Sequence, residues 1–113
     1  MSAVGVDIVD IKRISRLVKN DRFCRRVFSG REMAYCDSRK KPAQHYAVRF
    51  AAKEAVWKIL GRREITHKDI SVQNSPEGKP RVILSDKFRK LEKRISISLS
   101  HTDNYAVAVA VMK

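Results

Sequence analysis

The chain has 113 residues, 43% of them hydrophobic, which is enough to bury one core and too few to divide between two. We therefore expect a single domain over residues 1–113, and the hydrophobic content excludes a disordered tail protein. Lys and Arg number 25 against 12 Asp and Glu, so the formal net charge is +13. Such a field predicts an anionic partner: nucleic acid, an acidic membrane surface, an acidic protein or a phosphorylated small molecule.

The two cysteines and the lack of long apolar runs indicate the cellular compartment. Cys24 and Cys36 lie twelve positions apart without CxxC spacing, so two reduced thiols in a cytoplasmic protein are expected. The first ten residues contain two aspartates and lack the basic start and apolar run of a signal peptide. No apolar stretch reaches the roughly 20 residues of a membrane span. We therefore expect a soluble, intracellular protein with no membrane partner.

The beginning of the chain predicts a strand followed by a helix. Residues 3–11 have the β-branched content of a strand, interrupted by Asp7 and Asp10. Asp10 is suited to cap the helix that follows over residues 11–20. The apolar residues of that helix recur at helical spacing: Ile11, Ile14, Leu17 and Val18.

Two further helices are marked by their first residues. Ser29 and Glu32 have the S-x-x-E spacing of a capping box. Pro42 suits the first turn of a long central helix that runs to about Leu60 and stops at Gly61. This helix is rich in alanine, so it can lie close against a sheet. Its alanines include Ala47, Ala51, Ala52 and Ala55.

The second half of the chain predicts hairpins. Residues 69–84 read as two strands around a turn at residues 76–78, and Ser85 can cap a short helix. The last segment alternates between apolar and polar residues on either side of a connection at residues 101–104. Its apolar positions are Ile95, Ile97, Leu99, Val107, Val109 and Val111. The predicted class is α+β, with an antiparallel sheet packed against the long central helix and the shorter helices.

Asp7, Glu54 and Lys58 are the first candidates for chemistry. Glu54 and Lys58 are four residues apart on one helix face, where the simplest interpretation is a surface ion pair of little energetic value. Asp7, however, interrupts an apolar strand, where an unpaired carboxylate would be costly. The two carboxylates together could hold Mg²⁺ through oxygen ligands, and Mg²⁺ so held would accept phosphate oxygens from a substrate.

Three other features have a structural and a functional interpretation. His101, near the end of a predicted strand, is more often a structural hydrogen-bonding residue than a catalyst. Residues 78–80, Gly-Lys-Pro, form an ordinary hairpin turn and lack the glycine-rich loop and Ser/Thr of a P-loop. Trp57 is expected to pack in the core.

Four segments in order form the pattern of one enzyme family. They are GVDIVDIKRI near the N-terminus, RFAAKEAVWKILG at the centre, GKP in a later hairpin and SLSHTDNYAVAVAV near the end. Together they resemble the holo-acyl-carrier-protein synthases, the short trimeric type of 4′-phosphopantetheinyl transferase. The resemblance covers nearly the whole chain and rests on the order and spacing of the segments rather than on any one of them.

The resemblance implies an activity. Enzymes of this family transfer 4′-phosphopantetheine from coenzyme A to a serine hydroxyl of apo-acyl carrier protein, use Mg²⁺, release adenosine 3′,5′-bisphosphate and support fatty acid biosynthesis. It also implies a homotrimer with active sites at the subunit interfaces. The chemistry agrees with the residues, because charge that develops on phosphate oxygens is stabilised by a metal ion and a lysine.

The resemblance also assigns roles to individual residues. Asp7 and Glu54 would bind Mg²⁺, Lys58 would contact the phosphates of coenzyme A, and His101 would lie near the nucleotide. Glu54, Lys58 and His101 are therefore the catalytic candidates, with Glu54 the nearest candidate base for the serine hydroxyl. Further positions would border the coenzyme: Arg49, Gly78, Lys79 and Pro80. Asp7, Glu54 and Lys58 of one subunit would face His101 or residues 78–80 of another.

The basic residues near the N-terminus would dock the acidic carrier protein. In the family the corresponding basic helix binds the carrier, and here the assignment falls on Arg13 first and on Arg22 and Arg25 next. Most of the 25 basic residues of the chain are expected to be a solvated surface. One departure from the family is the loop at residues 61–64, which reads Gly-Arg-Arg-Glu in place of a glycine-rich loop.

Two other classes of function compete with the transferase. A small nucleic-acid-binding domain would explain the charge of +13, but the aromatic residues are not interleaved with basic ones as in a stacking platform. A purely structural subunit would leave Asp7 unexplained within its apolar strand. We therefore expect coenzyme A and acyl carrier protein as partners, and no nucleic acid.

Overall fold

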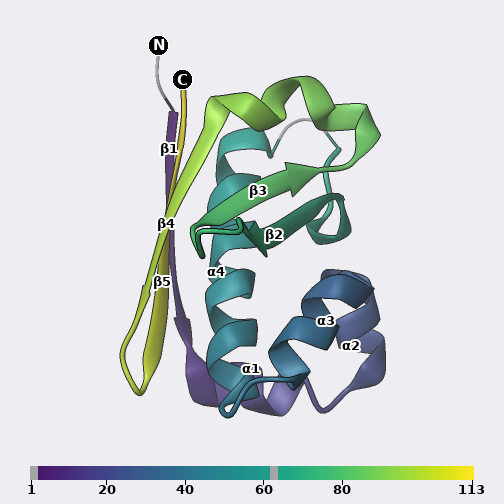
Figure 1. The fold of residues 1–113 in the computed structure, drawn as a ribbon, viewed down its shortest axis with the longest axis vertical. Coiled ribbons are helices and arrows are strands. Elements are labelled where there is room, and N and C mark those ends of the chain that lie inside the picture. The colour runs from purple at the N-terminus through teal and green to yellow at the C-terminus, as the bar shows by residue number, and fades with distance from the viewer. Residues whose placement is uncertain (1–2, 62–63) are drawn as a thin grey trace.

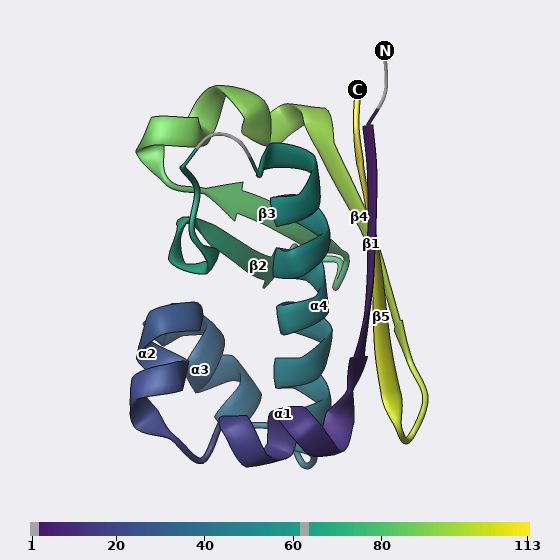
Figure 2. The ribbon, with the colours of Figure 1, turned by 180° about the vertical axis from the view of Figure 1, so that it is seen from behind.

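The computed structural model describes residues 3–61 and 64–113, and Figures 1 and 2 show the fold from opposite sides. The strands are β1 (Ala3–Asp10), β2 (Ile70–Asn74), β3 (Pro80–Leu84), β4 (Ile95–His101) and β5 (Tyr105–Met112). The α-helices are α1 (Ile11–Leu17), α2 (Asp21–Val27), α3 (Gly30–Asp37) and α4 (Pro42–Leu60). Two 3₁₀ helices are η1 (His67–Asp69) and η2 (Asp86–Arg94).

Helix α4 is the axis of the molecule, and the other elements lie on two sides of it (Figure 1). On one side is an antiparallel three-stranded sheet in the order β1-β5-β4. On the other side are the antiparallel β2-β3 hairpin and the helices α2 and α3, while α1 lies across the N-terminal end of α4 (Figures 1 and 2). The predicted α+β class, with an antiparallel sheet against a long central helix, is confirmed.

Most of the predicted helix boundaries hold because their capping groups form. The side chain of Asp10 accepts a hydrogen bond from the backbone N–H of Lys12, and Ser29 and Glu32 make the reciprocal bonds of a capping box. Pro42 lies in the first turn of α4, as predicted. The helix expected over residues 11–20 is shorter, because Asn20 caps the separate helix α2.

Three local predictions are corrected. Ser85 precedes a 3₁₀ helix, and its hydroxyl donates to Asp69 Oδ1 at 2.9 Å rather than capping that helix. His101 is the last residue of β4 rather than part of the connection. Trp57 is 39% exposed rather than in the core, and its Nε1 donates to the carbonyl of Ile65 at 3.1 Å.

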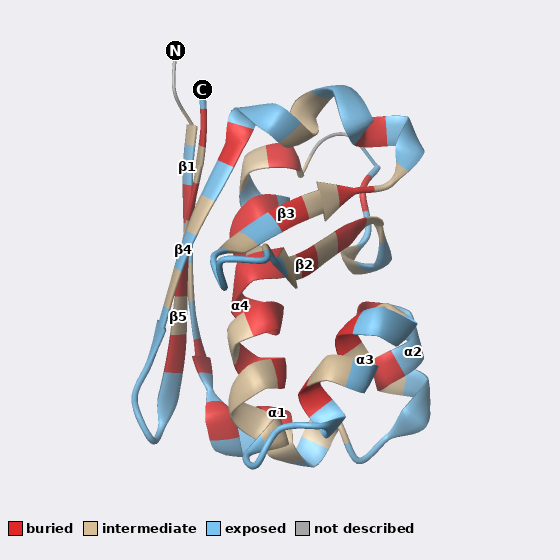
Figure 3. Cartoon of the chain, in the orientation of Figure 1, coloured by how far each residue is buried: buried red, intermediate tan, exposed pale blue. Residues whose placement is uncertain are grey.

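The contact between α4 and the sheet is made by small residues. A Cβ at Gly5 of β1 would lie 2.1 Å from the carbonyl oxygen of Ala55, so only glycine permits this approach. The facing residues of α4 and β5 are fully buried alanines (Figure 3): Ala47, Ala51, Ala52, Ala55, Ala106, Ala108 and Ala110. The helix therefore lies close enough to β1 for its polar side chains to reach that strand.

The opposite face of the three-stranded sheet is apolar and open. The strand register aligns three outward pairs across β1 and β5: Val4 with Val111, Val6 with Val109, and Ile8 with Val107. The β1 members of these pairs are 55% to 68% exposed. No element within residues 3–61 and 64–113 covers this face, which Figure 1 shows on the side of the sheet away from α4.

Cys24 and Cys36 are free and buried, which agrees with the predicted pair of reduced thiols. Burial raises the pKa of the Cys36 thiol to about 12. No described helix is long and apolar enough to cross a membrane. Arg62 and Arg63, in the loop that departs from the family pattern, lie outside the described residues.

Candidate active site

The helix face predicted to carry chemistry lies against β1. Lys58 Nζ donates to Asp7 Oδ1 at 3.1 Å and to the carbonyl of Val6 at 2.7 Å. Glu54, one turn earlier on α4, accepts a hydrogen bond from His67 Nε2, with 2.9 Å between that nitrogen and Glu54 Oε1. Glu54 and Lys58 therefore do not form the surface ion pair of the simplest interpretation within the described structure. Each side chain instead binds a partner from another element.

The donor atoms of Asp7 and Glu54 suit a hard divalent cation. Both side chains are partly open to solvent, at 18% for Asp7 and 26% for Glu54. Each uses one carboxylate oxygen in the contacts above, and within the described residues the other oxygen has no hydrogen-bond partner. No cluster of three or more His, Cys, Asp or Glu with metal-binding geometry occurs in the described part of the chain. Two carboxylates fit Mg²⁺, which takes few protein ligands and completes its shell with water and phosphate oxygens.

A second group of predicted residues lies on the other side of α4. Arg49, Pro80 and His101 line a hollow of about 220 Å³ together with residues of α3, α4, β2 and β4. His101 is exposed, and its Nδ1 lies 3.3 Å from the carbonyl oxygen of Thr102. Arg49 is 5% exposed. Its guanidinium carbon Cζ lies over the ring of Tyr35, 4.4 Å from the ring centroid. Its Nε has no hydrogen-bond partner in the described structure.

The start of α4 adds a basic hollow that the sequence analysis did not single out. This hollow of about 520 Å³ is lined by Ser38, Arg39, Lys40, Lys41, Gln44 and His45. Burial lowers the pKa of His45, and the positive charges of Arg49 and Arg39 lower it further. The basic run directly before Pro42 was the available signal, since the N-terminus of a helix favours anions.

Gly78 and Lys79 lie in the tight connection between β2 and β3, and Pro80 is the first residue of β3. Gly78 has φ +84°, a conformation that favours glycine, and its N–H donates to the carbonyl of Ser75 at 2.8 Å. Lys79 is exposed at the tip of the turn. Lys79 and Pro80 also line a hollow of about 420 Å³ between this turn and β4. The turn is therefore available to a ligand, although it lies away from Asp7.

One chain does not join the two groups of predicted residues. Arg49 and Glu54 are five positions apart on α4, a rotation of roughly 140° at 3.6 residues per turn, so they point to different sides of the helix. Asp7 lies on β1 and His101 on β4, which are opposite edges of the sheet. The structure thus brings Asp7 and Lys58 into contact, with Glu54 one turn before Lys58 on α4. It separately places Arg49, Pro80 and His101 around one hollow.

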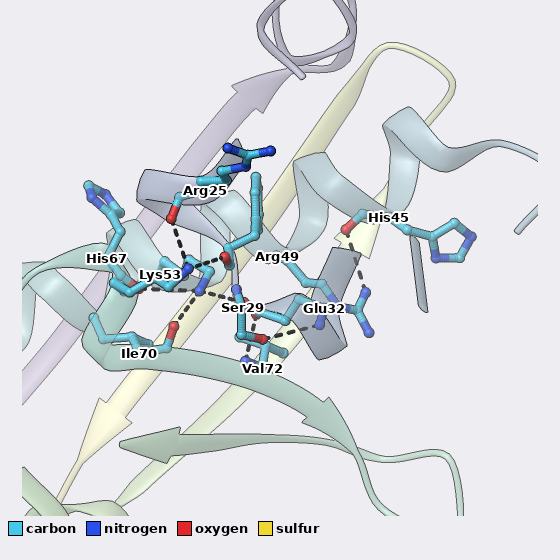
Figure 4. Close-up of polar contacts among 11 residues, drawn as sticks. Arg25, Ser29, Glu32, His45, Arg49, Lys53, His67, Ile70 and Val72 are labelled. Carbon is cyan, nitrogen blue, oxygen red and sulfur yellow. Dashed lines mark hydrogen bonds and ion pairs between the residues drawn. The ribbon is translucent and has the colours of Figure 1, made fainter. Parts of the chain in front are cut away.

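A buried ion pair joins Lys53 of α4 to Glu32 of α3 (Figure 4). Lys53 is 0% exposed and Glu32 is 2% exposed, and Lys53 Nζ lies 2.7 Å from Glu32 Oε1. Lys53 also donates to the carbonyl oxygens of His67 and Ile70. Glu32 Oε2 accepts the backbone N–H of Val72 at 2.8 Å. The pair therefore connects α3, α4, η1 and β2.

Sequence analysis missed Lys53 and His67, and it gave Glu32 only a capping role. A signal for Lys53 was present, because it shares a helical stripe with the buried residues Val56 and Leu60. Its partner could not be inferred, since Glu32 is 21 positions away on another helix. His67 carried no pattern at all and is recognised only by its contact with Glu54.

The predicted docking residues are on the surface. Arg13 lies on α1, and Arg22 and Arg25 lie on α2, and all three are exposed. Among the described residues none of them forms an ion pair. The neighbouring exposed cations of α1, α2 and their connection are Lys12, Arg16, Lys19 and Arg26. Helices α1 and α2 and their connection therefore present several positive charges that form no ion pair among the described residues.

Comparison with known proteins decides the family. The model of the 4′-phosphopantetheinyl transferase superfamily matches residues 3–110. The chain belongs to this superfamily. It is 44% identical to the holo-[acyl-carrier-protein] synthase of Geobacter sulfurreducens, over 96% of this chain and 94% of that protein. It is 41% identical to the synthase of the same name from Moorella thermoacetica, over 100% of this chain and 94% of that one.

Solved structures of the superfamily have the same fold. The holo-[acyl-carrier-protein] synthase of Helicobacter pylori, in complex with coenzyme A, superposes with a TM-score of 0.85 at 32% identity, covering 98% of this chain and 100% of that chain. The synthase of Neisseria meningitidis gives a TM-score of 0.86 at 32% identity, over 97% of this chain and 96% of that chain. The resemblance inferred from the four sequence segments is therefore confirmed.

The buried ion pair leads to a stability prediction. Lys53→Met leaves the carboxylate of Glu32 buried without its cation, so we expect the free energy of unfolding to fall by about 3–5 kcal/mol. Glu32→Gln leaves the ammonium without its counter-ion and should cost a similar amount. The double variant should cost less than the sum of the two, because no unpaired charge remains. Urea denaturation followed by circular dichroism measures each value at one fixed protein concentration.

Asp86→Ala is the matched control for this experiment. Its carboxylate pairs with Arg89 at 2.9 Å but is 99% exposed, so we expect a change below about 1 kcal/mol. Single variants of the buried pair that cost no more than this control would show that the pair does not hold the fold together.

Proposed function

We propose that this protein transfers 4′-phosphopantetheine from coenzyme A to a serine hydroxyl of apo-acyl carrier protein, in a Mg²⁺-dependent reaction that releases adenosine 3′,5′-bisphosphate. The observation that carries the proposal is the contact of Lys58 on α4 with Asp7 on β1, one helical turn from Glu54. It occurs in a chain that matches named holo-[acyl-carrier-protein] synthases over nearly its whole length. Charging of the carrier protein would place the enzyme in support of fatty acid biosynthesis.

Asp7, Glu54 and Lys58 would have different roles at the phosphate groups of coenzyme A. Asp7 and Glu54 would hold the Mg²⁺ through their free carboxylate oxygens. When bound, the ion would neutralise charge on the phosphate oxygens. Lys58 is 46% exposed on a flexible stem, so its ammonium can move from Asp7 to a phosphate oxygen. There it would stabilise the negative charge that grows as the serine oxygen attacks the β-phosphorus.

The proton of the serine hydroxyl needs an acceptor. Glu54 has one carboxylate oxygen without a partner among the described residues and is the candidate base, directly or through a water molecule. The bond that forms joins the serine oxygen to the β-phosphorus. The bond that breaks is the one between the β-phosphorus and the oxygen bridging it to the α-phosphorus, and that oxygen leaves with adenosine 3′,5′-bisphosphate. No covalent enzyme intermediate is required.

The two hollows at the start of α4 are proposed to bind the nucleotide end of coenzyme A. Arg39, Lys40 and Lys41 supply positive charge, and the N-terminus of α4 adds its partial positive charge. Arg49, Pro80 and His101 border the neighbouring hollow. The Gly78-Lys79-Pro80 turn would close its edge.

A homotrimer with sites between subunits is proposed from two observations. The outer face of the sheet is an open set of valine and isoleucine side chains, of the kind that subunit contacts bury. The two groups of site residues lie on different sides of α4 within one chain. A neighbouring copy that brings Arg49, Pro80 and His101 opposite Asp7, Glu54 and Lys58 would complete the site.

The acidic carrier protein is proposed to dock on Arg13, Arg22 and Arg25. Their exposure and lack of ion-pair partners in the described structure leave them available to carboxylates. The two free, buried thiols and the use of coenzyme A support a location in the cytoplasm.

The activity is tested with apo-acyl carrier protein, coenzyme A and Mg²⁺, followed by mass spectrometry of the carrier. We expect a mass gain of one phosphopantetheine group that is lost when EDTA removes the metal. Glu54→Ala should lower the rate by about 10²-fold or more, because it removes a proposed metal ligand. Asp86→Ala, on the distant helix η2, should leave the rate unchanged. Absence of any mass gain with the unaltered protein would disprove the proposal.

The docking surface is tested by charge reversal. Arg13→Glu should raise the KM for carrier protein by about tenfold while the Kd for coenzyme A stays constant, since only the carrier meets this surface. Lys93→Glu changes the net charge equally on η2, at the other end of the molecule, and should leave both constants unchanged. Steady-state kinetics and calorimetry measure them, and an equal loss in both constants for Arg13→Glu would refute the assignment.

The shared site is tested by complementation. Glu54→Ala and His101→Ala should each be impaired, but co-expressed chains should form mixed trimers in which about a quarter of the interfaces combine an intact Glu54 with an intact His101 by random assortment. Activity of the mixture should therefore exceed the average of the two separate variants. A mixture that is only as active as that average would place the whole site within one chain.

A further inference from the structure

His67 contacts the proposed metal ligand Glu54 from outside α4. Its Nε2 lies 2.9 Å from Glu54 Oε1, and its ring stacks on Phe50 with a centroid distance of 5.6 Å and an interplanar angle of 10°. An ionised carboxylate can only accept hydrogen bonds, so Nε2–H is the donor. The imidazole is therefore held flat against one residue of α4 and bonded to another.

The backbone of His67 is also fixed. Its carbonyl oxygen accepts a hydrogen bond from the buried Lys53 Nζ at 3.2 Å. At the other end of η1, Asp69 Oδ2 accepts the backbone N–H of Thr66 at 2.9 Å, and Asp69 Oδ1 accepts the hydroxyl of Ser85. The short helix that carries His67 is thus anchored both to the core of α4 and to the loop before η2.

From these contacts we infer that His67 is a positioning residue: it holds Glu54 Oε1 so that Oε2 is presented to Mg²⁺. The inference rests on the proposed function, in which Glu54 is a metal ligand. His67 itself is not assigned as a ligand, because Mg²⁺ prefers oxygen donors. A carboxylate held in one rotamer loses less conformational freedom when it binds the ion, which strengthens binding.

The path from the core to the metal site is continuous. The Lys53–Glu32 pair fixes the backbone of η1, the η1 backbone and Phe50 fix the His67 ring, and the ring fixes Glu54. Asp7 is bonded in a corresponding way by Lys58 of α4, whose Nζ donates to Asp7 Oδ1. Each proposed ligand therefore has one oxygen bonded to a neighbouring side chain and one free within the described structure.

Two variants separate the hydrogen bond from the ring. His67→Phe keeps an aromatic ring that can stack on Phe50 but removes the donor. His67→Gln removes the ring and keeps an N–H donor at a similar reach. Mg²⁺ is titrated into each protein, with coenzyme A bound, by isothermal titration calorimetry. The Mg²⁺ concentration for half-maximal transfer and the thermal unfolding midpoint are measured in parallel.

We expect His67→Phe to weaken Mg²⁺ binding by about tenfold, the lower end of the range for lost partners of metal ligands. The Mg²⁺ concentration for half-maximal transfer should rise by the same factor, and the rate at saturating Mg²⁺ should return close to that of the unaltered protein. His67→Gln should bind Mg²⁺ within about twofold of the unaltered protein. The unfolding midpoint of His67→Phe should not change, since the ring remains.

Three results would overturn the inference. The first is unchanged Mg²⁺ affinity in His67→Phe. The second is equal weakening in His67→Phe and His67→Gln, which would assign the effect to the lost imidazole rather than to its hydrogen bond. The third is a loss of activity that excess Mg²⁺ does not restore and that follows a lowered unfolding midpoint, which would make the role purely structural. If His67→Phe does not fold, weakened Mg²⁺ binding in His67→Gln would still overturn the inference.

The outcome is distinguishable from a failure of the proposed function. In that case the unaltered protein would not modify the carrier, or Glu54→Ala would retain full activity and Mg²⁺ affinity. If the unaltered protein is active and Glu54→Ala is not, a normal Mg²⁺ response in His67→Phe refutes the role of His67 alone.

Discussion

The structure depends on one buried ion pair, Lys53 with Glu32. Burial lowers the pKa of Lys53, and the adjacent Glu32 carboxylate opposes that shift by stabilising the ammonium. A charge so deeply buried is tolerated only when it is fully paired, so the position of each partner constrains the other. Because Lys53 also binds the carbonyls of η1 and β2, and Glu32 also caps α3, the pair determines how three elements (α3, η1 and β2) meet α4.

The second constraint is the close approach of α4 to the sheet. Gly5 and the facing alanines leave no bulky side chains between the helix and β1. The polar residues on the adjoining face, Glu54 and Lys58, therefore find partners on neighbouring elements rather than in each other. Glu54 and Lys58, which resemble a surface ion pair on an isolated helix, instead make two tertiary contacts: Lys58 with Asp7 of β1, and Glu54 with His67 of η1.

The surface of the chain has two regions of different chemistry, one apolar and one basic. The outer sheet face is apolar and open, whereas the cations of α1, α2 and the start of α4 have no ion-pair partner among the described residues. This division accounts for the charge of +13 without nucleic acid, because an acidic carrier protein and the phosphates of coenzyme A would meet different parts of the basic surface.

The sequence by itself determined the membership of the family and most of the elements, although not helix α2 or the 3₁₀ helix η1. Capping residues, alternation and the alanine-rich stretch are local signals, and Asp10, Ser29, Glu32 and Pro42 act where they were expected. Only the tertiary structure decided which side chains contact one another. Lys58 bonds Asp7 across 51 positions and His67 bonds Glu54 across 13, and periodicity gives the face of a residue but not what lies opposite it. For the same reason Trp57, predicted to pack in the core, is exposed. Lys53 is buried because its ammonium pairs with the Glu32 carboxylate.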